Sequence, residues 1–133
     1  MLLILGIIAA LTTPPITSAM ARIRADRAAQ VIGWDIRAAY SLASRQRTPV
    51  QIVVDGARLE YVVRDWSTAV ILQRRDLGPQ SAYGASSISS SASTITIFPH
   101  GLAEAPFHID LWASGQGRRL VVTRTGLVRV KVL

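Results

Sequence analysis

Residues 1–11 of the chain, MLLILGIIAAL, form an uncharged apolar run, and Pro14 and Pro15 follow it almost directly. A helix that crosses a bilayer needs about 20 apolar residues, so this run supplies only part of one. It also lacks the basic residues that normally precede the apolar core of a signal peptide. We therefore interpret the run as the second half of a membrane anchor that is joined directly to a soluble domain.

Beyond the prolines, apolar residues recur every three or four positions, which is the period of an amphipathic helix. Pro49 ends the pattern, because the residue before a proline avoids the helical region. The pattern predicts one continuous helix of about 45 residues that is kinked at the two prolines. The arginines and aspartates between Arg22 and Arg37 are interpreted as a solvated, partly ion-paired face. The residues expected to pack this helix on the rest of the domain are Val31, Ile32, Ile36, Ala39 and Ala43.

After Pro49 the apolar pattern changes to the alternation that is typical of β-strands. Asp55-Gly56 joins the first two alternating runs and predicts a β-hairpin. Residues 78–93 are rich in Ser, Gly and Ala, and we expect a long flexible loop there. Further short strands are predicted at 69–72, 94–98 and 107–111, with a closing hairpin at 120–123 and 127–132.

These elements predict an α+β fold, in which a long N-terminal helix packs on a C-terminal antiparallel β-sheet or sandwich of about six or seven short strands. We divide the chain into a hydrophobic helix half (1–15), an amphipathic helix half (16–48) and a β-rich head (49–133). At about 1.5 Å rise per residue the helix is near 70 Å long, which is longer than so small a head. The apolar tip must therefore be buried in lipid or in other subunits.

The chain is basic: 15 Lys and Arg residues against eight Asp and Glu residues give a formal net charge of +7, and Lys131 is the only lysine. Such a balance favours an anionic partner. No acidic residue follows Asp110. The cations beyond it are Arg118, Arg119, Arg124, Arg129 and Lys131. Arg129 and Lys131 share one face of the last predicted strand and form a basic stripe there. We consider two interpretations of this stripe: it contacts anions such as DNA phosphates, or its charges protect an edge strand from aggregation.

Catalytic and metal-binding patterns are weak. The chain has no cysteine and two histidines, and His108 and Asp110 share one face of a predicted strand without a third ligand. No Gly-x-Ser-x-Gly motif occurs, and Gly115-Gln116-Gly117 lacks the following helix of a phosphate-binding loop. We expect neither an enzyme nor a bound cofactor or metal.

The order of several motifs resembles one family. Gly6 to Pro14 resembles the second half of the N-terminal helix of type IV pilins and type II secretion pseudopilins. Within that class, the GspH/FimT-type minor pseudopilins are similar to this chain at 27–29, 37–39, 43–45, 49–50, 97–101 and 120–130. The resemblance covers nearly the whole chain and rests on the order of these motifs rather than on any single one.

This resemblance implies a pilin-like minor pseudopilin, a structural subunit of the type II secretion pseudopilus that acts in protein export across the outer membrane. It implies an N-methylated, single-pass helix in the bacterial inner membrane, with the head in the periplasm. The implied partners are other pseudopilins, inner-membrane lipid and secreted cargo. The residues that would contact membrane or filament core are Leu2, Leu3, Ile4, Leu5, Ile7, Ile8, Leu11 and Pro14.

The chain departs from the family pattern in two places. The leader and prepilin-peptidase site are absent from this sequence, and aligning Pro14 with the family's helix proline leaves about eight residues missing from a bilayer span, so we expect a start further upstream. DNA-binding members carry Gly-Arg-x-Arg in the closing turn, where this chain has Gly126-Leu127-Val128-Arg129.

Two alternatives follow. The first is a type IV pilus minor pilin that binds DNA for uptake through the five C-terminal cations. The second treats residues 1–21 as a cleaved signal peptide, since Ala19-Met20-Ala21 has the small-x-small form of a cleavage site. The sequence leaves open the cargo, the neighbouring pilins and the choice between a secretion system and a pilus.

Overall fold

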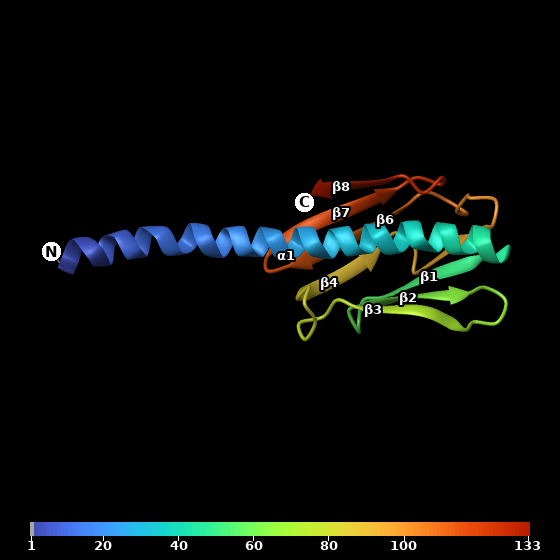
Figure 1. The fold of residues 1–133 in the computed structure, drawn as a ribbon, viewed down its shortest axis with the longest axis horizontal. Coiled ribbons are helices and arrows are strands. Elements are labelled where there is room, and N and C mark those ends of the chain that lie inside the picture. The colour runs from blue at the N-terminus through green and yellow to red at the C-terminus, as the bar shows by residue number, and fades with distance from the viewer. Residues whose placement is uncertain (1) are drawn as a thin grey trace.

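The computed structural model describes the backbone of residues 2–133 and the side chains of residues 19–133. A single helix, α1, runs from Leu2 to Gln46 and confirms the predicted long N-terminal helix. Its 45 residues extend about 68 Å at the usual rise per residue. Figure 1 shows the N-terminal part of α1 running past the end of the β-sheets.

The side chains expected to contact membrane or filament core, Leu2 to Leu11 and Pro14, lie outside the described part of the chain. Among the described residues, no helix holds a stretch long and apolar enough to cross a membrane.

Eight strands follow α1 in the described chain and form two four-stranded sheets. The strands are β1 (Val50–Asp55), β2 (Glu60–Asp65), β3 (Ile71–Asp76), β4 (Ala85–Ser90), β5 (Thr94–Ile97), β6 (Phe107–Ala113), β7 (Gln116–Val122) and β8 (Val128–Val132). The first sheet has the order β3-β2-β1-β5 and the second has the order β4-β6-β7-β8, with antiparallel pairing throughout. The predicted α+β class, with a helix on an antiparallel β domain, is confirmed.

Turn chemistry accounts for the hairpins. β1 and β2 pair across the Asp55-Gly56 turn, as expected, and β7 pairs with β8 as the closing hairpin. Between β6 and β7 only Ser114 and Gly115 form the loop, and both have positive φ (52° and 76°). Two such residues in succession are what a tight type I′ hairpin turn requires.

The prediction of one long flexible loop over residues 78–93 was wrong, because β4 lies inside it and pairs with β6. Ala85 and Ile88 of β4 are buried, while the serines around them face outward. Serine has little intrinsic preference for strands, so composition hid this element, and pairing with the apolar strand β6 overrides that weak local preference. The described chain consequently has eight strands instead of six or seven.

The core lies between α1 and the inner faces of the two sheets, and Figure 1 shows the C-terminal half of α1 lying across them. Alternate residues of the central strands point inward, as the apolar alternation predicts. The largest fully buried side chains are Ile32, Ile36, Val50, Ile52, Leu77, Ile95, Ile97, Ile109, Leu111, Leu120 and Val122.

Candidate functional site

One side of α1 is buried against the sheets. The structure places the five residues expected to pack the helix, Val31, Ile32, Ile36, Ala39 and Ala43, together in the hydrophobic core, each with at most 7% of its surface exposed. Small alanines at two of these positions allow the helix backbone to lie close to the strands. This buried stripe fixes the rotation of α1 about its own axis.

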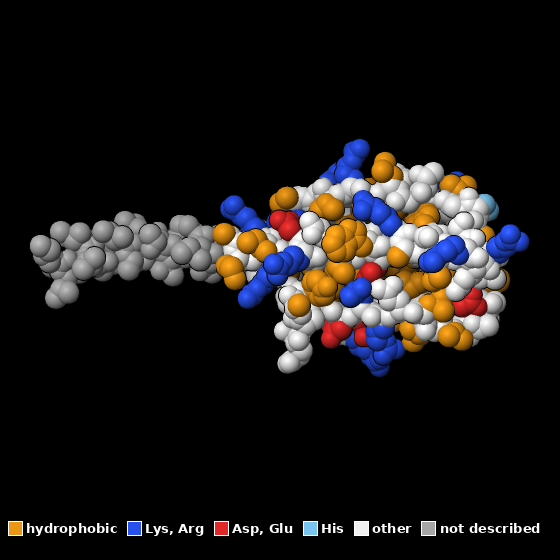
Figure 2. All heavy atoms as spheres, in the orientation of Figure 1, with side chains coloured by type: hydrophobic (Ala, Val, Ile, Leu, Met, Phe, Trp, Pro, Cys, Tyr) orange, Lys and Arg blue, Asp and Glu red, His pale blue; other side chains and the backbone are white. Residues whose placement is uncertain are grey.

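The opposite side of α1 is exposed and carries large apolar residues that no neighbour covers. Trp34 is 62% exposed, and Met20 and Ile23 are about half exposed. Arg27 and Arg37 lie on the same side of the helix, and Figure 2 shows hydrophobic and cationic side chains intermixed on this face. Trp34 was not predicted as a contact residue, although a large apolar side chain four residues beyond Gln30, on the polar face of the helix, is a signal for one.

A buried carboxylate joins α1 to the first sheet. Asp35 Oδ2 accepts hydrogen bonds from the Tyr61 hydroxyl group at 2.5 Å and from Arg75 Nε at 2.9 Å. Its Oδ1 accepts from Arg75 Nη2 at 3.2 Å and from Gln73 Nε2 at 3.0 Å. Both oxygens are therefore saturated, as a buried charged group requires.

Burial raises the pKa of Tyr61 far above its ordinary value, and the hydrogen bond to Asp35 adds to this shift. The pKa of Arg75 is also raised, chiefly by its hydrogen bonds to Asp35. Tyr61 is therefore a neutral donor and Arg75 a cation at neutral pH. The cluster acts as a permanent polar link between α1, β2 and β3.

A second carboxylate joins α1 to the other sheet. Arg118 of β7 is almost completely buried and donates from Nε to Asp26 Oδ1 at 2.9 Å. Its Nη1 donates to the carbonyl oxygen of Gly117 at 2.8 Å. Because a buried guanidinium needs a counter-ion, Asp26 stabilises the position of β7 under the helix.

The interpretation of the helix acids as a solvated, partly ion-paired face was wrong for Asp35 but holds for Asp26, whose side chain is 57% exposed. Asp35 is 6% exposed, and both Asp26 and Asp35 bind arginines of the β domain instead of arginines of α1. A signal was present: position 35 lies three residues after Ile32 and four before Ala39, inside the apolar stripe. The partners Tyr61, Gln73 and Arg75 could not be found from spacing, since they are distant in sequence.

Tyr40 holds the closing turn against α1. Its hydroxyl group donates toward the carbonyl oxygens of Thr123 and Arg124, at 3.3 and 3.1 Å. Gly126 has φ +92°, and a Cβ added there would lie 3.1 Å from the Tyr40 ring. Glycine is required at this turn for both its backbone conformation and the close approach of the ring.

The five C-terminal cations do not form one stripe. Arg118 points inward to Asp26, whereas Arg119 points outward and holds Asp110 through two hydrogen bonds of 2.7 and 2.9 Å. The hydrogen bond from Arg119 is the main cause that lowers the pKa of Asp110. Strand alternation separates neighbouring residues onto opposite faces, so the consecutive arginines could not share one surface.

Of the remaining three, Arg124 donates from Nε to the carbonyl oxygen of Ala103 at 3.2 Å. Arg129 and Lys131 lie on the outer face of β8 and form no ion pair among the described residues. The structure thus reduces the candidate anion-binding surface to Arg129 and Lys131, with Arg119 partly neutralised beside them.

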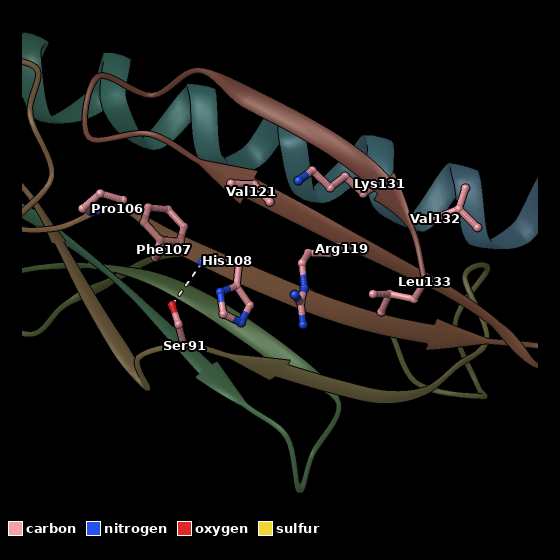
Figure 3. A pocket seen from close by; sticks show the side chains of 9 residues that line it. All are labelled: Ser91, Pro106, Phe107, His108, Arg119, Val121, Lys131, Val132 and Leu133. Carbon is pink, nitrogen blue, oxygen red and sulfur yellow. Dashed lines mark hydrogen bonds between the residues drawn. The ribbon is translucent and has the colours of Figure 1, made fainter.

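A shallow groove runs along this outer face between β6, β7 and β8, with a volume of about 320 Å³. Figure 3 shows His108 and Arg119 extending side by side from β6 and β7, with Lys131 on β8. The His108 backbone N–H donates to Ser91 Oγ at 3.0 Å, which anchors the segment after β4 at one end of the groove. Val121 forms part of its apolar floor.

Among the described residues, no three His, Cys, Asp or Glu side chains come together as possible metal ligands. His108 and Asp110 do share one face of β6, as expected, but Asp110 is engaged with Arg119. His100 stacks on Phe98 with ring centroids 5.6 Å apart. His100 is exposed and His108 is half-buried.

A long N-terminal helix that covers antiparallel sheets defines a pilin-like protein. Residues 28–126 match the family described as Type II transport protein GspH, and this match covers well over half of the chain. The chain therefore belongs to the GspH family, which confirms the resemblance to GspH/FimT-type minor pseudopilins. A comparison with curated protein sequences yields no match.

Solved structures of two bacterial proteins share the fold. The type IV minor pilin FimU of Pseudomonas aeruginosa is 16% identical, with a TM-score of 0.66 over 83% of this chain and 90% of FimU. The minor pseudopilin EpsH from the Type 2 Secretion System of Vibrio cholerae is 13% identical, with a TM-score of 0.62 over 82% of this chain and 97% of EpsH. At such identities the similarity shows the fold alone.

Proposed function

We propose that the chain is a minor pseudopilin, a structural subunit of a type II secretion pseudopilus that acts in protein export across the outer membrane. Membership of the GspH family supports a role in this class of assembly. The observation that carries the proposal is the one-sided burial of α1. One side is packed on the sheets, and the other exposes Met20, Ile23 and Trp34.

An isolated domain gains nothing from large apolar side chains held in water, whereas a filament subunit buries them against neighbouring helices. In this proposal the partners of the exposed face are other pseudopilins. Leu2–Leu11 and the residues around them lie in the bacterial inner membrane as a single pass before assembly and in the filament core afterwards. The head lies in the periplasm, where it meets neighbouring minor subunits or secreted cargo, and the mature N-terminus is methylated.

The proposed role is structural and not catalytic. The buried charged side chains Asp35 and Arg118 join α1 to the sheets through Tyr61 and Asp26, respectively. They are satisfied by one another, which leaves them no free geometry for acting on a substrate.

Gene deletion tests the proposal. Loss of the gene is expected to block secretion of an exported enzyme, while the same enzyme folds and accumulates in the periplasm. Re-expression of the wild-type chain restores secretion. Normal secretion in the deletion strain contradicts the proposal.

The alternative is a type IV pilus minor pilin that binds DNA for uptake. Its support is the adjacent pair Arg129 and Lys131 on the outer face of β8. A mobility-shift assay with the full chain in detergent and a short DNA duplex at low salt distinguishes the DNA-binding minor pilin from the secretion pseudopilin. Binding that is lost in Arg129→Ala and Lys131→Ala, together with loss of DNA uptake but normal secretion on deletion, favours the alternative. The absence of a shift, or a shift that these substitutions leave unchanged, counts against it.

A further inference from the structure

Strand β8 ends its sheet with an unpaired edge. Leu133 N–H donates to the carbonyl oxygen of Gly117, and Thr123 N–H donates to that of Leu127, both at 3.0 Å. These two bonds lie at the two ends of β8 and show which of its residues bond to β7, because hydrogen-bonded and non-bonded positions alternate in an antiparallel pair. Arg129 and Lys131 therefore direct their backbone groups toward β7. The N–H and C=O groups of Val128, Val130 and Val132 point away, where no described strand pairs with them.

The side chains on the inward side of this edge are valines that are incompletely covered. Val128 lies over the helix, since a Cβ added at Gly33 would be 3.7 Å from its Cγ1. Further along, Val130 is 47% exposed and Val132 is 74% exposed. A hollow of about 240 Å³ lies between β8 and α1 and is lined by Asp26, Ala29, Gln30 and Val130. Figure 1 shows β8 as the outermost strand on this side of the molecule.

The outward side of the same edge is cationic. Arg129 and Lys131 border a second hollow that includes Val121 and Leu127, and neither cation has a carboxylate partner among the described residues. Arg119, one strand further in, is already paired with Asp110. A strand that lies beside β8 would therefore need apolar side chains on its inward face and acidic side chains on its outward face.

We propose that β8 accepts an added antiparallel strand from a partner protein, an extended segment of about five residues in which apolar and acidic residues alternate. Its backbone pairs with Val128, Val130 and Val132. Its apolar side chains cover Val130 and Val132 beside α1, and its acidic side chains face Arg129 and Lys131. The requirement for alternation follows from the two faces of the edge.

Other occupants fit less well. A second copy of β8 would set arginine and lysine side chains opposite one another, and like charges on paired strands repel. A nucleic acid could neutralise Arg129 and Lys131, but it has no amide ladder to pair with the free edge and nothing to cover the valines. In this proposal Arg129 and Lys131 have two effects: they discourage pairing of β8 with a second copy of itself, and they favour a partner strand with acidic side chains.

This inference does not depend on the proposed role in secretion, since it rests on the edge of the sheet alone. A direct test uses the full chain in detergent and a fluorescein-labelled peptide of alternating valine and glutamate. Fluorescence anisotropy is expected to show saturable binding. Two control peptides, one with lysine in place of glutamate and one with the same residues in two blocks, are expected to bind at least about tenfold more weakly. Equal binding of the block peptide overturns the proposal.

Backbone methylation separates strand addition from charge attraction. Two variants of the peptide carry N-methyl groups either on the valine nitrogens or on the glutamate nitrogens, so that each has one blocked edge. An antiparallel added strand turns its valine nitrogens toward β8, and methylation there should weaken binding about tenfold or more. Methylation of the glutamate nitrogens should leave binding unchanged. The proposal fails if both variants bind like the parent peptide.

The chain offers a matched pair of variants. Val130→Pro removes an N–H that points out of the sheet, a position where an edge strand tolerates proline, and it should abolish peptide binding. Val130→Thr keeps the N–H and should bind within about twofold of the wild type. Two outcomes overturn strand addition. In the first, the peptide still binds the Val130→Pro variant but no longer binds a variant in which the charges of Arg129 and Lys131 are reversed. In the second, a DNA duplex displaces the peptide and binds the Val130→Pro variant as tightly as the wild type.

Hydrogen exchange on the wild-type chain tests the same contact without any substitution. On addition of the peptide, the Val128, Val130 and Val132 amides should exchange more slowly, whereas the Arg129 amide already bonds to β7 and should change little. Unchanged exchange at the three valines under saturating peptide overturns the proposal, even where Val130→Pro fails to fold.

Discussion

Asp35 of α1 accepts a hydrogen bond from the Tyr61 hydroxyl group of β2 across 2.5 Å, and Arg75 of β3 donates to the same oxygen. Asp26 of α1 accepts from Arg118 of β7 at 2.9 Å. The two helix carboxylates thus bind different sheets. Because charge-assisted hydrogen bonds are directional, these two contacts fix the position of α1 relative to both sheets.

Replacing Asp35 should destabilise the fold strongly. Asp35→Asn removes the charge that balances Arg75 and leaves buried donors imperfectly paired, so we expect a loss of about 3 kcal/mol in the free energy of unfolding. Denaturant unfolding of the full chain in detergent measures it. Glu60→Gln is the control, because Glu60 forms no ion pair among the described residues, and it should change stability little. A loss below about 1 kcal/mol for Asp35→Asn would mean that the cluster does not hold the helix.

Gly126→Ala should be more harmful than Gly115→Ala, although both glycines have positive φ. At Gly115 nothing lies within 4 Å of an added Cβ, so only backbone strain of about 1 kcal/mol is expected. At Gly126 the Tyr40 ring lies 3.1 Å from that Cβ and must move, which brings the expected loss to about 2 kcal/mol or more. Thermal unfolding of the two variants, side by side, makes the comparison. Equal losses would show that Tyr40 does not constrain the turn.

The Arg119–Asp110 pair should stabilise the fold above acidic pH only. The pKa of Asp110 is lowered below its ordinary value of 3.8, mainly by the hydrogen bond from Arg119. A lowered pKa in the folded state contributes stability above the unfolded value, and that stability is lost as pH falls through the folded value. The stability difference between wild type and Asp110→Asn should therefore shrink from about pH 5 to about pH 2, and the effect should be small because the pair is partly exposed. A difference that stays constant over this range would contradict the assignment.

Tyr61 should resist ionisation in the folded protein. Burial, and then its hydrogen bond to Asp35, raise its pKa above the ordinary value of 10.0. A raised pKa contributes stability below pH 10, and this stability is lost as pH rises above it, because the unfolded chain then releases the proton more readily. Ultraviolet titration should show tyrosinate from Tyr61 only when the chain unfolds. The Tyr61→Phe variant should lack this last step, and an unchanged titration curve would refute the prediction.

Trp34 should matter for assembly and not for folding. Because its side chain is 62% exposed, Trp34→Asp should alter unfolding free energy by less than about 1 kcal/mol. If the exposed face of α1 contacts neighbouring pseudopilins, the same change should weaken co-purification of partner subunits about tenfold or more. Trp66→Asp is a matched control, since Trp66 is 57% exposed but lies after β2. Equal assembly of Trp34→Asp and wild type would remove α1 as the contact face.

Local patterns were sufficient for much of the fold. The apolar stripe through Ile32, Ile36 and Ala43 predicted the buried side of α1. The turn residues Asp55-Gly56 and Thr125-Gly126 predicted the β1–β2 and β7–β8 hairpins. β4 was missed because serines surround its two buried apolar residues, Ala85 and Ile88, and an irregularity in the pairing between Ala85 and Ser87 breaks the period of two. The alternation placed Arg129 and Lys131 on one face of β8, but it could not show that Arg118 is buried and bound to Asp26.

The sequence by itself determined the long helix, the strand-forming half and the kinship to the GspH family, because periodicity and motif order are local properties that survive in one dimension. Only the tertiary structure decided which charged side chains are buried in ion pairs and which remain exposed at the surface. Asp35 and Arg118 are buried by segments distant in the chain, whereas Arg129 and Lys131 are left on a free edge. Spacing cannot reveal such pairings, since electrostatic and hydrogen-bond partners are chosen by proximity in space, which the packing of α1 on the two sheets creates.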